Sequence, residues 1–327
     1  MVFPLMTPSM RYSGKSPLPE IHASLEELAR LRFKATGFSF LPRQPVQSIL
    51  SGRHGSRLRG RGLNFEELRH YLPGDDLRTI DWKVTARTRK PHVRVYTEER
   101  DRVVWLLVDQ RISMFFGSRN KMKSLIAAEA AALSAWRVLA AGDRVGAIVF
   151  DDQDYSIIPP HRSSERVMQI LRSIVDRNSN LSAGSPIPAD PAMLNRVLQK
   201  ADSLASHDCL LVLISDGFGI DQDSRRHITR MSAHNDILSL FIYDPLEQAL
   251  PNAGRLIFAD PGGQLEINTE SASLRENFSN EFEDRLARMK TTSRRYAIPL
   301  LKLSTAHPIL HQVREQLGEH AAARAIK

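Results

Sequence analysis

The sequence predicts an α/β fold in which helices cover both faces of a mostly parallel sheet. Beyond Val103, short continuous apolar runs alternate with segments of helical periodicity, as expected for parallel strands joined by helical crossovers. Two of the apolar runs, VVWLLVD and CLLVLISD, end in an aspartate followed by polar or small residues. Buried strands that end in acids predict a site at the carboxyl edge of the sheet.

Composition and length set the organisation of the chain. With 327 residues, 42% hydrophobic and 25% charged, it is globular and long enough for one large or two small domains. We expect an N-terminal arm with a short helix over residues 1–45, an Arg- and Asp-rich segment over 46–98 that packs on the sheet, and the α/β domain over 99–327.

The cellular location follows from one cysteine and from hydropathy. Cys209 lies in an apolar run and has no partner for a disulfide within the chain, which fits a reducing compartment. The start of the sequence lacks the pattern of a signal peptide, and no window approaches the roughly 20 apolar residues that cross a bilayer. We therefore expect a cytoplasmic protein.

The elements before Val103 are short. Leu25 to Phe33 has the pattern of a helix, and NFEELRH, Asn64 to His70, predicts a helical turn. Pro73 and Gly74 then predict a tight turn. The alternation in HVRVYT, His92 to Thr97, indicates a half-buried strand.

The elements after Val103 build the sheet. Strands are predicted at 103–109, 144–150, 155–159, 208–216, 236–244 and 296–303, and Pro159 and Pro160 place the third of these at an edge. Helices are predicted at 121–141, 164–176, 191–206, 223–233 and 271–290, with a terminal helix after the last strand. A turn signal at Asp260-Pro-Gly-Gly predicts a small hairpin of strands 255–258 and 264–267.

The net charge of +8 is concentrated in one region. Between Arg43 and Arg102 there are fourteen Lys or Arg against eight Asp or Glu, a difference of +6, and four arginines crowd its start, namely Arg53, Arg57, Arg59 and Arg61. An anionic partner is one interpretation. The alternative is internal pairing of these arginines with acids of the same segment, namely Glu66, Glu67, Asp75, Asp76 and Asp81.

Asp109 and Asp216 are the candidates for chemistry. If the first and fourth strands are neighbours, both carboxylates face one crevice at the carboxyl ends of the strands. The alternative is helix capping or turn formation, which acids after strands often provide.

Two stretches together identify a family resemblance. They are GSRLRGRGLNFEELRHYLPGDDLRTIDWKVTAR, Gly55 to Arg87, and VVWLLVDQRISM, Val103 to Met114. They resemble a bacterial family catalogued as domain of unknown function number fifty-eight, whose core is a von Willebrand factor A-like domain. The resemblance implies a metal ion-dependent adhesion site in which Asp109, Ser113 and Asp216 ligate Mg²⁺.

Two positions depart from that adhesion-site pattern. Arg111 stands where a serine is expected, and the loop that should supply a threonine offers Ser182 or Ser185. A guanidinium close to a dication would repel it by several kcal/mol. Either Arg111 turns outward from a bound Mg²⁺, or the metal is absent and Arg111 itself neutralises Asp109 and Asp216.

The upstream signature has its own candidates, and they alternate arginine and aspartate around one tryptophan: Arg69, Asp75, Asp76, Arg78, Asp81, Trp82 and Arg87. One interpretation is a docking surface. The other, which the density of opposite charges favours, is a scaffold of bidentate pairs.

The functional hypothesis is a non-enzymatic adaptor. The resemblance implies a MoxR-type AAA+ ATPase as partner, together with a client protein, and a docking face formed by Asp109, Arg111, Ser113 and Asp216. The P-loop, nucleophile-elbow, HExxH and CxxC signatures are all absent from the sequence. The rival hypotheses are a Mg²⁺-dependent phosphodiesterase or nuclease using the same acids, and, with less support, a basic module that binds nucleic acid.

Overall fold

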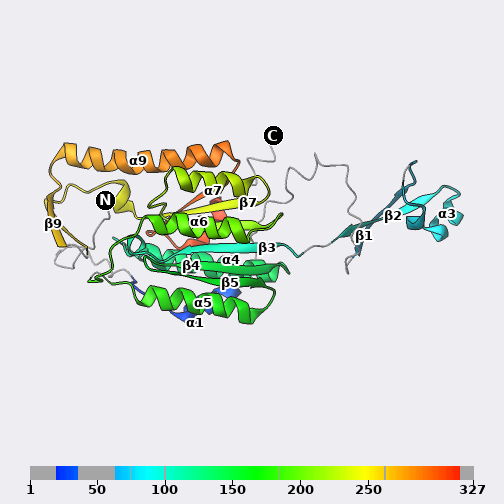
Figure 1. The fold of residues 1–327 in the computed structure, drawn as a ribbon, viewed down its shortest axis with the longest axis horizontal. Coiled ribbons are helices and arrows are strands. Elements are labelled where there is room, and N and C mark those ends of the chain that lie inside the picture. The colour runs from blue at the N-terminus through cyan, green and yellow to red at the C-terminus, as the bar shows by residue number, and fades with distance from the viewer. Residues whose placement is uncertain are drawn as a thin grey trace. The chain divides into compact units, whose positions relative to one another are not determined.

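The protein consists of two compact units (Figure 1). A computed structural model describes residues 20–35, 63–73, 75–98, 101–182, 184–260 and 263–316. Residues 45–101 form the small unit, and residues 1–44 with 102–327 form the large unit. The arginine cluster between Arg53 and Arg61 lies outside the described residues.

The large unit is built on a six-stranded sheet with the order β10-β7-β6-β3-β4-β5. Its strands are β3 (Val103–Asp109), β4 (Arg144–Phe150), β5 (Tyr155–His161), β6 (Leu210–Ser215), β7 (Asp236–Tyr243) and β10 (Leu300–Ser304). All neighbours pair in parallel except β4 and β5, so β5 is an antiparallel edge strand. The predicted α/β fold and the edge position of the third strand are confirmed.

Helices cover both faces of this sheet, as predicted (Figure 1). They are α1 (Leu25–Arg30), α4 (Lys123–Ala140), α5 (Ser164–Ser179), α6 (Ala192–Leu204), α7 (Gln222–Ser232), the short α8 (Pro245–Gln248) and α9 (Ala272–Arg295). Residues 309–316 are also helical. Short 3-10 turns occur at η1 (Leu31–Phe33) and η3 (Ile112–Met114). None of the helices among the described residues has the length and apolarity needed to span a bilayer.

Alternation along β3 shows how the two layers form. Val104, Leu106 and Val108 face the core that α4 and α5 fill, whereas Trp105 and Leu107 face the core that α6 fills. Every one of these side chains is at most 5% exposed. A strand that is buried on both faces has a continuous apolar sequence, and β3 could be predicted from the sequence for this reason.

The small unit is a two-stranded antiparallel ribbon with one short helix. It contains β1 (Leu63–His70), η2 (Leu77–Thr79), α3 (Trp82–Thr88) and β2 (His92–Glu98). The prediction of a helical turn over Asn64 to His70 is wrong, because this segment pairs with β2 from Leu63↔Glu98 to His70↔His92. Glu, Leu and Arg favour helix locally, but cross-strand pairing decides the conformation.

The predicted hairpin after α8 is confirmed. It consists of β8 (Arg255–Asp260) and β9 (Gly263–Asn268), which pair antiparallel. The hairpin leads into α9, whose Phe282, Leu286 and Met289 are buried beside Phe241 of β7. Helix α9 therefore lies against the sheet close to the carboxyl end of β7.

Candidate functional site

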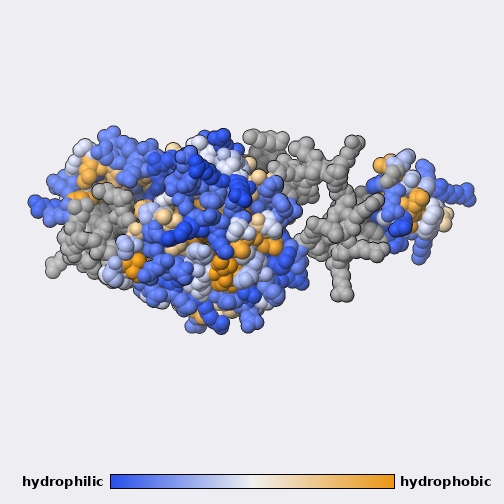
Figure 2. Space-filling view, in the orientation of Figure 1, coloured by the Kyte–Doolittle hydropathy of each residue, from blue (hydrophilic) through white to orange (hydrophobic). Residues whose placement is uncertain are grey.

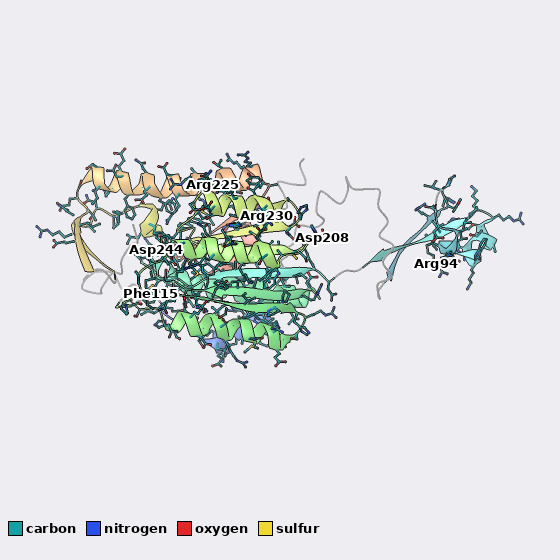
Figure 3. The ribbon with its side chains drawn as sticks, in the orientation of Figure 1. Arg94, Phe115, Asp208, Arg225, Arg230 and Asp244 are labelled. Carbon is teal, nitrogen blue, oxygen red and sulfur yellow. The ribbon has the colours of Figure 1, made fainter. Side chains whose placement is uncertain are left out.

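Three adjacent parallel strands end in buried aspartates. Asp109 ends β3, Asp216 follows β6 and Asp244 follows β7, and their exposed fractions are 0%, 1% and 0%. Because β6 pairs with both β3 and β7, the prediction that the first and fourth strands are neighbours is confirmed. We call the ends of these three strands, with the loops that follow them, the carboxyl edge; Asp244 is labelled in Figure 3.

Arg111 neutralises Asp109 in a fully buried bidentate pair. Its Nε and Nη2 donate to Oδ1 and Oδ2 of Asp109 at 3.0 and 2.7 Å, and its backbone N–H donates to Oδ1 at 3.0 Å. The hydroxyl of Ser215 donates to Oδ2 at 2.7 Å. Both side chains of the pair are 0% exposed. The neighbouring carboxylate outweighs the cost of burial and raises the pKa of Arg111.

Lys123, at the start of α4, neutralises Asp216. Its ammonium group is 2.9 Å from Oδ2 of Asp216 and 2.9 Å from Oε1 of Glu247, and all three residues are at most 3% exposed. Although burial opposes ionisation of Asp216, the charges of Lys123, Arg111 and Arg285 hold the pKa of this carboxyl well below its usual range. One buried cation thus serves two buried carboxylates.

Asp244 is satisfied by donors from two other segments. Its carboxylate accepts from the N–H of Ser118 at 2.8 Å, from the N–H of Leu246 at 2.8 Å, and from the hydroxyls of Ser118 and Thr305 at 2.5 Å. The backbone N–H of Asp244 donates to Glu247 in a capping box at the start of α8. This acid is therefore a structural cap that joins the loop after β3 to β10.

Arg111 also ties neighbouring loops together. It donates to the carbonyl of Asp190, before α6, at 3.3 Å and to the carbonyl of Phe218, after β6, at 2.9 Å. Its guanidinium carbon lies 5.6 and 5.7 Å from the ring centres of Phe150 and Phe218. The planar fork of an arginine suits this combination of carboxylate, carbonyl and aromatic contacts.

Asp152 joins the turn after β3 to the segment before α6, and within the described residues it has no cationic hydrogen-bond partner. It accepts from the N–H of Ile112 at 2.6 Å and from the N–H of Asp190 at 2.8 Å. Burial nevertheless raises the pKa of Asp152 to about 6, because the desolvation of the carboxylate outweighs these two amides and the charge of Arg111. Asp152 is a carboxyl whose charge changes in a mildly acidic range.

The predicted docking residues lie inside the carboxyl edge. Asp109, Arg111 and Asp216 are at most 1% exposed and Ser113 is 8% exposed, so they offer a partner almost no direct contact area. Their hydrogen bonds instead fix the backbone of the loops around them. Any molecule that contacts this edge would meet those loops, because the four side chains lie beneath them.

Ser182 and Ser185, the serines predicted for the threonine position, form no hydrogen bond with Asp109 or Asp216 among the described residues. The backbone oxygen of Ser182 accepts from Ser185, and the hydroxyl of Ser185 accepts from the N–H of Ile187. The segment that does reach the site is Asp190, through its carbonyl and its N–H.

In this arrangement the oxygen atoms at the carboxyl edge do not form a binding site for Mg²⁺. One observation favours a missing ligand, since the hydroxyl of Ser113 is buried and has no hydrogen-bond partner among the described residues. However, the oxygens of Asp109 are taken by Arg111 and Ser215, and those of Asp216 by Lys123 and the N–H of Phe218. A dication among these groups would meet two buried cations. Arg111 and Lys123 supply the positive charge that the resemblance assigns to a metal.

Several of these groups were missing from the sequence prediction, namely Lys123, Asp152, Ser215, Asp244 and Glu247. Glu247 carried a signal, because Asp244-Pro-Leu-Glu has the spacing of a capping box. Lys123 carried a weaker one, as the basic start of an otherwise apolar Ala-rich helix. Asp152 lies in the turn between β4 and β5, and only the crossover topology brings this turn to Asp190.

In the small unit, the predicted aspartates serve as internal partners. Arg69 binds Asp75 through two bonds of 2.8 Å, and these hydrogen bonds lower the pKa of Asp75. Asp81 caps α3 and accepts from Arg94, labelled in Figure 3, at 2.8 Å, which lowers its pKa in the same way. Asp76 caps η2 through the N–H of Arg78.

The remaining signature residues of the small unit are exposed. Trp82 is 69% exposed, and Leu77, five residues before it in the sequence, is 63% exposed. Figure 2 shows hydrophobic colour among the hydrophilic surface of this unit. The exposed basic residues Arg78, Lys83, Arg87, Arg89 and Lys90 have no ion pair among the described residues. The small unit thus combines a paired scaffold with a basic, partly apolar surface.

The sheet order and the helices on both faces define an α/β protein with a mostly parallel six-stranded sheet, and buried acids lie at the carboxyl edge of that sheet. The chain belongs to the family described as protein of unknown function DUF58, whose model matches residues 67–288. Uncharacterized proteins of Mycobacterium tuberculosis (Rv1480) and Mycobacterium bovis (Mb1516) are each 29% identical over 265 residues, which covers 80% of this chain and 81% of the relative.

Two solved structures show more distant similarity. The conserved hypothetical protein BatB from Bacteroides thetaiotaomicron aligns with a TM-score of 0.40 and 14% identity, over 68% of this chain and 99% of that chain. A von Willebrand factor type A protein from Catenulispora acidiphila aligns with a TM-score of 0.25 and 13% identity, over 46% of this chain and 35% of that chain.

Proposed function

We propose that the protein is a non-enzymatic adaptor that binds another protein at the carboxyl edge of its large unit. The observation that carries this proposal is the internal neutralisation of that edge, where Arg111 and Lys123 pair with Asp109 and Asp216 while they fix the surrounding loops. Loops held in one conformation lose less entropy on binding, which favours a recognition surface. The same pairing leaves Asp109 and Asp216 poorly placed to act as catalytic bases.

The proposed partner is a MoxR-type AAA+ ATPase in the cytoplasm, which would remodel a client protein. The support is the family resemblance carried by the signature segment and by the end of β3. The adaptor would connect the ATPase to its client through two surfaces, one on each unit. This division accounts for a chain in which the large unit buries the charged groups of its carboxyl edge while the small unit exposes several basic side chains.

Affinity purification from the native host tests the proposal. The tagged protein is purified with ATP present, as the parent chain and as the variants Asp216→Ala and Asp223→Ala. Asp223 is an exposed residue of α7 and serves as the control. We expect the parent and Asp223→Ala to recover an AAA+ ATPase, and a folded Asp216→Ala to recover much less, because the loop after β6 loses its anchor. Equal recovery of the ATPase by the parent and both variants contradicts the proposal, and so does the absence of an ATPase from all three purifications.

A hydrolase assay addresses the enzymatic alternative. Generic phosphodiester and nucleic-acid substrates are incubated with the protein and Mg²⁺ or Mn²⁺, with Asp109→Ala as the matched variant. An adaptor gives no turnover above background in either protein. A turnover that the parent shows and Asp109→Ala lacks would assign a metal-dependent activity to the carboxyl edge.

A second candidate function has a specific observation behind it. The exposed Trp82 stands among basic side chains on α3, a combination that suits stacking on a base and contact with phosphates. Nucleic-acid binding by the small unit would fall steeply with salt. Titration of a fluorescent oligonucleotide at low and high salt tests it, and no binding at low salt removes this candidate.

A further inference from the structure

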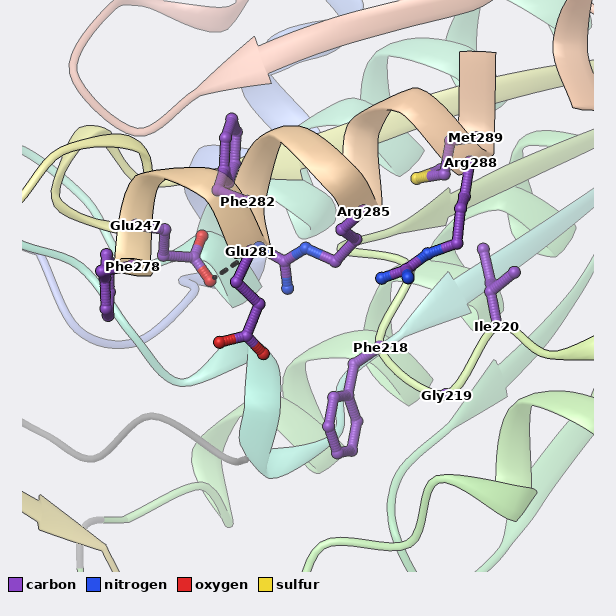
Figure 4. A pocket seen from close by; sticks show the side chains of 11 residues that line it. Phe218, Gly219, Ile220, Glu247, Phe278, Glu281, Phe282, Arg285, Arg288 and Met289 are labelled. Carbon is purple, nitrogen blue, oxygen red and sulfur yellow. Dashed lines mark hydrogen bonds and ion pairs between the residues drawn. The ribbon is translucent and has the colours of Figure 1, made fainter. Parts of the chain in front are cut away.

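A cavity of about 170 Å³ lies beside the carboxyl edge, between the loop after β6 and helix α9 (Figure 4). The loop contributes Phe218 and Ile220, and α9 contributes Arg285 and Arg288. Gly219 shapes the wall, because it has a φ of +83° and an added Cβ would lie 2.4 Å from the carbonyl oxygen of Pro191. The cavity is therefore built into the same loop that Arg111 and Asp216 hold.

Arg285 brings an under-satisfied cation to this cavity. Its Nη2 is 3.5 Å from Oε1 of Glu247, at the limit of a hydrogen bond, and its Nε is buried with no partner in the described part of the chain. Glu247 is already bonded to Lys123 at 2.9 Å, so it does not serve Arg285 alone. The guanidinium carbon is supported by the rings of Phe241 and Phe282 at 5.9 and 5.6 Å. An arginine on an aromatic support, whose Nη2 makes only this long contact among the described hydrogen bonds, is well placed to bind an anion through its Nη groups, since Nε itself is buried.

Arg288 adds a second guanidinium to the same space. It lies three residues after Arg285, on the same face of α9, and both side chains point into the cavity in Figure 4. Arg288 is exposed and has no ion pair within the described part of the chain. Two guanidinium groups of this kind can hold the two oxygens of one carboxylate.

Glu281 restricts which anion fits. Its carboxylate also lines the cavity, one helical turn before Arg285, and it is exposed (Figure 4). Glu281 would repel a phosphate with nearly two negative charges more strongly than a carboxylate with one, which offsets part of the additional attraction of phosphate to the two arginines. A peptide, unlike a phosphate, also carries N–H groups that can donate to Glu281. The walls of Phe218 and Phe278 suit an apolar neighbour of the acidic residue.

We propose that this cavity binds an aspartate or glutamate side chain of a partner protein, with its carboxylate between Arg285 and Arg288. The inference rests on the proposed adaptor function and deepens it, because it names the chemical group that the carboxyl edge recognises. The recognising cations belong to α9, whereas the buried Arg111 and Lys123 hold the loop that forms the opposite wall.

Titration of the ¹⁵N-labelled full chain with short peptides tests the cavity without any ATPase. The probes are N-acetylated, C-amidated Leu-Glu-Leu, the same peptide with Gln in place of Glu, the Gln peptide with a free C-terminal carboxylate, and inorganic phosphate. We expect the Glu peptide to shift the amide signals of Gly217, Phe218 and Gly219, and the amidated Gln peptide and phosphate to leave them in place. Equal shifts with the amidated Gln peptide, or binding only of the free C-terminus or of phosphate, would overturn the proposal.

Matched arginine variants locate the binding on α9. Arg288→Glu is expected to weaken the Glu peptide at least tenfold, whereas Arg294→Glu, an exposed residue of the same helix outside the cavity, leaves the affinity unchanged. Arg288→Gln provides the same comparison if charge reversal disturbs folding. Unchanged affinity in a folded Arg288 variant contradicts the assignment. If Arg288→Glu loses the peptide but still recovers the ATPase from the host, the cavity is confirmed as a carboxylate site and the ATPase is assigned to another surface.

Discussion

The two units use the same chemistry, arginine or lysine paired with aspartate, at opposite degrees of burial. At the carboxyl edge Arg111 and Asp109 are both 0% exposed, whereas in the small unit the side chain of Arg69 is 38% exposed and that of Arg94 is 47% exposed. Buried pairs fix conformation and are costly to break, while exposed pairs contribute about 0–1 kcal/mol and remain open to solvent. The comparison assigns the fixation of the partner-binding loops to the buried pairs of the large unit, and a partly solvent-exposed scaffold to the pairs of the small unit.

Removal of Lys123 tests the buried side of the comparison most severely. In Lys123→Met, Asp216 and Glu247 stay buried without their shared cation, and we expect the free energy of unfolding to fall by about 3–5 kcal/mol. Urea denaturation measures the change. Lys290→Met, an exposed lysine of α9, is the control and should stay within about 0.5 kcal/mol of the parent. Similar values for the two variants would show that Lys123 is not part of a buried charge cluster.

Arg111→Ser should have the next largest effect. The variant leaves Asp109 with only the hydroxyl of Ser215 and backbone donors, so we expect a loss of about 3 kcal/mol, at the lower end of the range for a broken buried pair. Denaturation in metal-free buffer gives the value. The matched surface variant is Arg226→Ser, whose pair with Asp223 is exposed and should contribute less than about 1 kcal/mol. Equal losses would remove the distinction between buried and exposed pairs.

The pH dependence of stability separates Asp152 from the acids of the small unit. Its pKa is raised from 3.8 to about 6, so the folded chain binds more protons than the unfolded chain between those values. The contribution of Asp152 to the free energy of unfolding is complete below about pH 4 and is lost as the pH rises through about 6. The loss is at most about 1.4 kcal/mol per pH unit.

Denaturation of the parent and of Asp152→Asn from pH 4 to 7 isolates this contribution. We expect the stability of the parent, relative to Asp152→Asn, to decrease across that range. Asp75 and Asp81, whose pKa values are lowered, contribute in the opposite direction, with stability that is lost as the pH falls. A relative stability that increases from pH 4 to 7 would mean that the amides of Ile112 and Asp190 lower the pKa of Asp152.

The smallest effect on stability is expected for Trp82→Ala. The side chain is 69% exposed, so the free energy of unfolding should change by less than about 0.5 kcal/mol. Binding of the native partner, measured by quantitative recovery from the host, should nevertheless decrease, because exposed tryptophans are frequent anchors of interfaces. A large loss of stability would place Trp82 in the scaffold of the small unit. Unchanged recovery of the partner would remove Trp82 from the binding surface.

The parallel sheet was predictable because β3, β6 and β7 are continuous apolar runs with helical segments between them. The same pattern predicted that Asp109 and Asp216 come together, since strand ends define an edge once neighbours are known. The segment from Asn64 to His70 was mispredicted because its residues favour helix, and only the ladder with β2 imposes a strand.

The charge pairs were only partly predictable. Arg111 as the neutralising group for Asp109 was one of the two alternatives that its position within the motif left open. Lys123, ninety-three residues from Asp216, gave no local signal of that contact, because the crossover topology alone joins the start of α4 to the end of β6. Whether each arginine of the small unit is paired or exposed likewise depends on three-dimensional positions that alternation in sequence does not encode.

The central claim is that Arg111 and Lys123 take the place of a metal at the carboxyl edge. Calorimetric titration of Mn²⁺ into the parent chain and into Arg111→Ser tests it directly, because the serine restores the Asp-x-Ser-x-Ser pattern and frees the oxygens of Asp109. The account predicts no specific binding to the parent and a single new site in Arg111→Ser that disappears when Asp109→Asn is added. One-site binding to the parent that Asp109→Asn abolishes would contradict the account and restore a metal to the carboxyl edge.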